Sequence, residues 1–120
     1  MSEQSPEVKS FVDDCVVDYH SGVYEDDVNR SDVVVATVML ILVAEGLRVM
    51  LPEIQEWLAL GAAAIELKRQ EVEKRLMAYA AEKELDYDVA KKSAAIIAKR
   101  LDEKSLKTIF NALQKLVGKE

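Results

Sequence analysis

Residues 33–44 read VVVATVMLILVA, and Thr37 is the only polar residue among these twelve. A run of this kind is compatible with a membrane span, a buried strand, a buried helix or a subunit interface. A strand is disfavoured because the apolar segment is longer than the usual four to eight residues. No neighbouring segment alternates with a period of two, so a strand here has no predicted partner.

A membrane span needs about twenty predominantly apolar residues, and here Glu45 and Arg48 fall inside any such window. At about 100° per residue, Thr37, Glu45 and Arg48 lie within one narrow arc of a helix, and almost everything else is apolar. The run therefore predicts a buried helix over residues 32–51, covered by the rest of the chain or by a second copy. A membrane hairpin of residues 33–51 and 54–67 is a disfavoured alternative, because it would also have to accommodate Glu53 and Glu56. We expect Glu45 and Arg48 to pair with each other or with neighbouring polar groups.

The flanking sequence predicts further helices, which begin at Ser5-Pro6, at Pro52, at Asp86 or Asp88, and at Asp102. Ser and Asp are good N-caps, and proline suits the first helical turn. Gly22 is expected to end the first helix, and residues 24–30 have no apolar period and indicate a loop. The pattern predicts a single all-α domain over residues 1–120, a compact bundle of about five helices around the helix at 32–51.

The third predicted helix, residues 52–84, raises a problem of size. Unbroken, it is about 50 Å long at 1.5 Å per residue, whereas a compact domain of 120 residues is roughly 35 Å across. Either Gly61 breaks the helix, or its far half packs against another chain. The second alternative favours a homodimer whose candidate interface residues are Val35, Leu42, Ile65, Val72, Leu76 and Tyr79.

Composition agrees with a small helical protein of a reducing compartment. Half of the residues are hydrophobic and 32% are charged, with only four glycines and two prolines. The single cysteine, Cys15, rules out an internal disulfide, and the first residues, MSEQSPEVKS, lack the features of a signal peptide. We therefore expect a cytoplasmic protein.

Charge is distributed unevenly along the chain, whose net charge is −6. Residues 1–32 hold nine acidic residues against two basic ones, in an acidic helix and loop that end near residue 31. Residues 89–120, the predicted C-terminal helix pair, hold eight basic residues against three acidic ones. The simplest expectation is that the two ends face each other in the fold or in a dimer, or that both are solvated.

The basic C-terminal helices supply a candidate contact face for an acidic protein partner or, as an alternative, for a nucleic acid. The order helix, short turn, helix resembles a DNA-binding arrangement, but Asp102 and Glu103 occupy the turn and would face phosphate. The candidate contact residues are Lys91, Lys99, Lys104, Lys107 and Lys115.

The sequence nominates no catalytic, cofactor-binding or metal-binding residue. His20 is the only histidine and has only nearby carboxylates such as Asp13 beside it, which is too few ligands for a site. Cys15 lies on an apolar helix face, and no glycine-rich phosphate loop occurs. We expect a non-enzymatic, homo-oligomeric protein without a cofactor that acts through protein–protein interaction. A nucleic-acid-associated protein and an acidic metal-binding bundle are the alternatives.

Overall fold

The computed structural model describes residues 5–21 and 32–118, and every regular element in these ranges is helical. The predicted all-α bundle is confirmed. The elements are α1 (Pro6–Tyr19), α2 (Asp32–Ile41), the π-helical segment η1 (Leu42–Gly46), α3 (Leu47–Val49), α4 (Leu51–Leu60), α5 (Ala62–Glu82), α6 (Tyr87–Arg100) and α7 (Glu103–Gly118).

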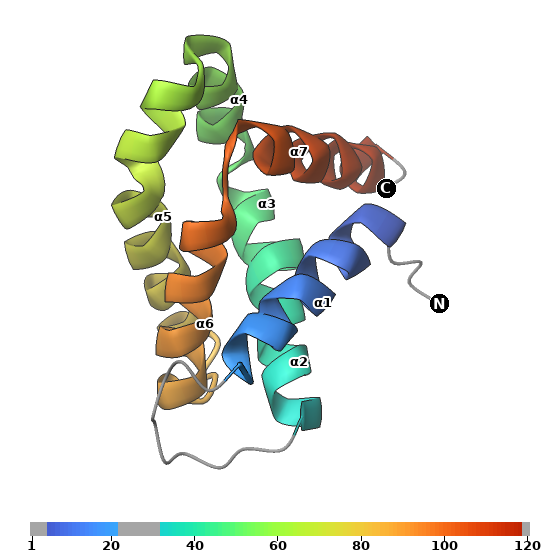
Figure 1. The fold of residues 1–120 in the computed structure, drawn as a ribbon, viewed down its shortest axis with the longest axis vertical. Helices are drawn as coiled ribbons and strands as arrows, with labels where there is room; N and C mark the ends of the chain where they lie inside the picture. Colours follow the sequence, from blue (N-terminus) through green and yellow to red (C-terminus); the bar gives the residue numbers. More distant parts are fainter. Residues whose placement is uncertain (1–4, 22–31, 119–120) are drawn as a thin grey trace.

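The apolar run forms the centre of the bundle (Figure 1). Helices α2, η1 and α3 follow one another without a break and form one rod, which contacts α1, α5 and α6. Its inward side chains are buried, whereas Val33 at its beginning is exposed. The buried members are Val35, Val38, Met39, Leu42, Val43 and Leu47. A central helix covered mainly by its own chain is therefore the correct interpretation of this run.

Within the described ranges, no single helix has both the length and the apolar composition of a membrane span. One pair of helices meets both criteria together, Asp32–Val49 with Leu51–Leu60, and this pair is bent by 77° at its break.

The predicted long helix over 52–84 is two helices, because the chain breaks at Gly61. This residue has φ 105° and ψ −178°, a conformation that side-chain-bearing residues rarely adopt. The break gives one helical rod more than the five expected. It also resolves the mismatch between the predicted helix length of about 50 Å and the size of the domain, since the whole molecule measures 40 × 36 × 25 Å.

The other predicted helix boundaries agree closely with the structure. Ser5 caps α1 by accepting a hydrogen bond from the Glu7 N–H, and Asp86 caps α6 in the same way through the Val89 N–H. Asp102 accepts a hydrogen bond from the Ser105 N–H at the beginning of α7. The predicted loop at 24–30 and the stop at Gly22 lie outside the described residues.

The acidic and basic ends of the sequence face each other where α1 packs against α6. Arg100 donates two hydrogen bonds to the Asp18 carboxylate, over 2.5 and 3.1 Å, and lies 3.9 Å from Asp14. These hydrogen bonds hold the pKa of Asp18 below its ordinary value. The Lys92 ammonium also lies 4.2 Å from the centre of the Tyr19 ring. Part of the charge asymmetry is therefore neutralised inside the fold.

Helix α5 approaches η1 closely at Gly46. A Cβ atom on Gly46 would lie 2.7 Å from Cδ2 of Leu76, so a larger residue here would require the Leu76 side chain to shift. One turn further along α5, the Tyr79 hydroxyl donates a hydrogen bond of 2.6 Å to Glu45. Glu45, expected to pair with a polar neighbour, thus has its partner on α5.

We predict that Tyr79 titrates anomalously because of this contact. The hydrogen bond to Glu45, followed by burial and by the charge of Glu45, raises the pKa of Tyr79 to about 12. A raised pKa stabilises the fold at pH values below the ordinary tyrosine pKa of about 10, and this contribution is lost as the pH rises through about 12. The absorbance at 295 nm of the wild type minus that of Tyr79→Phe should therefore rise with a midpoint near 12.

Two control experiments accompany this titration. Glu45→Gln keeps an acceptor but removes the charge, so the Tyr79 midpoint should move toward the ordinary value. Circular dichroism at each pH shows whether the helices are still folded. A midpoint near 10 in the folded wild type would contradict the Tyr79–Glu45 hydrogen bond.

Candidate interaction surfaces

His20 and Cys15 have the side chains best suited to metal binding and to nucleophilic attack. His20 Nε2 lies 3.1 Å from Asp32, and no group of three or more His, Cys, Asp or Glu residues in the described part of the chain is arranged to hold a metal. Cys15 is buried, and this burial raises the pKa of its thiol to about 12, so the nucleophilic thiolate does not form near neutral pH.

The structure places the candidate interface residues inside the single chain. Five of them, Val35, Leu42, Ile65, Val72 and Leu76, belong to the hydrophobic core, and Tyr79 is partly buried against it. The apolar periodicity correctly showed that these side chains must be covered. They are covered by the other helices of the same chain, so a contact between folded copies has to use other residues.

The face of α5 opposite to its buried residues is exposed to solvent. Helix α5 forms one edge of the molecule and packs mainly against α6, with α4 and η1 as its other neighbours (Figure 1). Leu67 is 81% exposed at its outer face, and Glu66, Gln70 and Lys74 are exposed beside it. The α5 outer face is defined here by Ala63, Glu66, Leu67, Gln70, Lys74, Met77 and Ala78, of which only Met77 is partly buried.

The five lysines of the candidate basic face are all exposed but lie on two helices. Lys91 and Lys99 are on α6, whereas the other three follow the outer side of α7 at helical spacing. Helix α1, with its carboxylates, packs against both α6 and α7. Lys115 is near enough to Glu7 to contribute to the lowered pKa of that carboxyl, although the hydrogen bond from Ser5 is the main cause.

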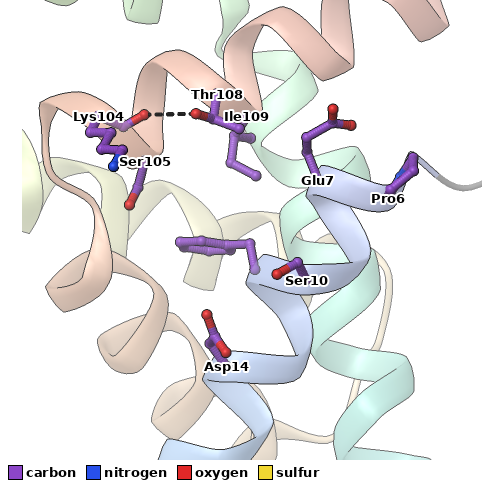
Figure 2. Close-up of a pocket in the computed structure, with 9 residues that line it drawn as sticks. Pro6, Glu7, Ser10, Asp14, Lys104, Ser105, Thr108 and Ile109 are labelled. Atoms are coloured by element: carbon purple, nitrogen blue, oxygen red, sulfur yellow. Dashed lines mark hydrogen bonds between the residues drawn. The ribbon is translucent and has the colours of Figure 1, made fainter.

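A groove lies between α1 and α7, with a volume of about 490 Å³ (Figure 2). Its base includes Phe11 of α1 and Ile109 of α7, which are 9% and 1% exposed. Polar residues line its two walls: Glu7, Ser10 and Asp14 come from α1, and Lys104, Ser105 and Thr108 come from α7. Pro6 completes the lining.

Neither surface as a whole was predicted from the sequence, although Lys104 of the groove belongs to the candidate basic face. In the sequence, Leu67 is an isolated leucine among charged residues, and it lies outside the buried stripe of its helix. Phe11 and Ile109 fit the core stripes of their own helices, and nothing local shows that these two stripes meet. Comparison of the chain with models of protein families, with curated proteins and with solved structures finds no match.

Proposed function

We propose that this is a non-enzymatic helical protein that works by protein–protein contact and associates with itself through the α5 outer face. The observation that carries the proposal is the self-complementary order of residues along that face. Leu67 is the most exposed large apolar side chain of this face, at 81%, and the proposed contact would remove it from water. A single buried cysteine suits the reducing cytoplasm that we propose as its compartment.

The proposed contact is an antiparallel pair of α5 helices related by a two-fold axis at Gln70. Such an axis puts residues at equal distances on either side of Gln70 at the same height. Glu66 and Lys74 each lie four residues from Gln70, so an acid of one copy meets a base of the other twice. Ala63 and Met77 each lie seven residues away and give an apolar contact on both sides.

The remaining residues of the face fit the same arrangement. Gln70 meets its own copy, and an amide both donates and accepts hydrogen bonds. Leu67 lies at the height of the partner's Glu73 and Lys74 and can pack on the aliphatic stem of the lysine. A single helix pair buries less than the roughly 800 Å² per partner of a standard interface, so we expect dissociation constants in the micromolar range or weaker.

Charge reversal tests this arrangement. Lys74→Glu and Glu66→Lys each turn two attractive contacts into repulsive ones, and each should weaken the dimer by about tenfold or more. The double variant Glu66→Lys/Lys74→Glu restores both pairs and should regain most of the affinity. Sedimentation velocity at increasing protein concentrations measures the dissociation constant of each variant.

Lys107→Glu provides a matched control, because it makes the same charge change at an exposed position of α7. It should leave the dissociation constant unchanged. A wild type that stays monomeric at millimolar concentration contradicts self-association. A dimer that responds equally to Lys74→Glu and Lys107→Glu contradicts the α5 contact.

A further inference from the structure

One edge of the central rod, formed by α2, η1 and α3, is not covered by the other described helices. The rod edge is defined by every fourth residue from 33 to 49, namely Val33, Thr37, Ile41, Glu45 and Val49. Four of these residues are exposed, and Ile41 is half-buried without belonging to the hydrophobic core. Val33 is 73% exposed and Val49 is 59% exposed. The helix at the centre of the fold thus also presents apolar side chains to water.

The π-helical segment η1 keeps this edge on one side of the rod. In an α-helix each residue turns by about 100°, so residues four apart are offset by about 40°. From residue 33 to residue 49 this drift would reach about 160° and would carry Val49 to the far side. The wider turn of η1, with hydrogen bonds between residues five apart, opposes the drift from Leu42 to Gly46. Segments of this kind frequently occur at functional sites.

We propose that the rod edge binds the rod edge of a second copy, antiparallel and around a two-fold axis at Ile41. Val33 and Val49 each lie eight residues from Ile41, so an exposed valine of one copy meets an exposed valine of the other twice. Thr37 and Glu45 each lie four residues from Ile41, and the threonine hydroxyl donates a hydrogen bond to the carboxylate of the other copy. Ile41 packs on its own counterpart at the axis.

Charge complementarity favours a second copy over a lipid surface. Only Asp32, Glu45 and Arg48 are charged among residues 32–51. In the antiparallel pair, Arg48 lies within two residues, or about 3 Å along the axis, of the height of the partner's Asp32. The Asp32 carboxylate is exposed beside His20, and Glu45 is exposed beside Tyr79, and a carboxylate accepts several hydrogen bonds. A lipid surface would bury the same charges without opposite ones.

The rod contact is distinct from the proposed α5 contact. Helix α6 lies between α2 and α5 and packs against both, so the rod edge and the α5 outer face are on different sides of the molecule (Figure 1). Each contact is a single helix pair, so for the rod contact too we expect a dissociation constant in the micromolar range or weaker. With both two-fold contacts on one protomer, assembly continues past the dimer.

Sedimentation velocity of the Lys74→Glu variant isolates the rod contact, because this substitution weakens the α5 contact. We expect the variant still to dimerise. In that background, Thr37→Glu puts like charges opposite each other at two places and should weaken the dimer by about tenfold or more. Adding Glu45→Lys makes both pairs attractive and should regain most of the affinity. Residues 37 and 45 are about 12 Å apart along one helix, so this rescue requires contact between copies.

Thr108→Glu is the matched control, because it makes the same chemical change at an exposed threonine of α7. It should leave the dissociation constant within about twofold, and circular dichroism checks that every variant is folded. A Lys74→Glu variant that stays monomeric at millimolar concentration overturns the rod contact. Equal effects of Thr37→Glu and Thr108→Glu, or no rescue by Glu45→Lys, overturn it as well.

The two self-contacts fail separately in this experiment. If Lys74→Glu assembles as strongly as the wild type, the α5 contact is wrong, and the response to Thr37→Glu still decides the rod contact. In the Thr37→Glu background the α5 contact is isolated in the same way. If both contacts form, the wild type reaches species larger than a dimer, and either single variant stops at the dimer.

Discussion

Replacing Leu76 by alanine is expected to lower the free energy of unfolding by about 2–5 kcal/mol. Leu76 is fully buried on the inner face of α5, where it touches Gly46 of the central rod. The substitution removes apolar contacts and leaves a cavity between two helices that close packing holds in place. Because a domain of this size is stable by about 5–15 kcal/mol, the loss is a large part of the total. Urea unfolding followed by circular dichroism measures it.

Leu67→Ala is the matched control for this variant. It makes the same chemical change on the same helix at a side chain that is 81% exposed, and its effect should stay within about 0.5 kcal/mol. Both variants are measured at concentrations well below the dissociation constant of the proposed dimer, so that self-association does not contribute. Equal losses at the two positions would show that α5 does not pack with the face that the structure assigns to it.

This pair of leucines also shows what the sequence could and could not reveal about α5. The spacing of Ile65, Val72 and Leu76 correctly shows that these side chains share a face that must be covered. Periodicity does not say what covers it, and a helix assumed to run unbroken through Gly61 was too long for the domain. Breaking at Gly61 lets α5 fold back on its own chain, so the stripe enters the core and the opposite face reaches the surface.

Local sequence signals predicted the helix ends more accurately than they predicted the candidate interaction surfaces. The caps at Ser5, Asp86 and Asp102 could be predicted because a cap depends only on residues a few positions away. The groove joins Phe11 to Ile109, which are far apart in the sequence. Their meeting depends on how α1 and α7 cross, and no local pattern contains that geometry.

Gly46→Ala is expected to cost about 1–3 kcal/mol in the free energy of unfolding, because the new methyl group overpacks the contact with α5. The Cβ atom would lie 2.7 Å from Cδ2 of Leu76, closer than such atoms approach in real proteins. Cδ2 is the end of a flexible side chain, but Leu76 is fully buried and its surroundings leave it little room to move. Without the clash, alanine would be the better residue in a helix by about 0.5–1 kcal/mol.

The sign of this effect should therefore depend on residue 76. In the Leu76→Ala background the obstructing atom is gone, and Gly46→Ala should be neutral or stabilising, which amounts to a coupling of about 1–3 kcal/mol between the two positions. Unfolding of the wild type, both single variants and the double variant in urea completes the cycle. If the two changes simply add, Gly46 is not required by the approach of Leu76, and the close contact between η1 and α5 is not what selects glycine there.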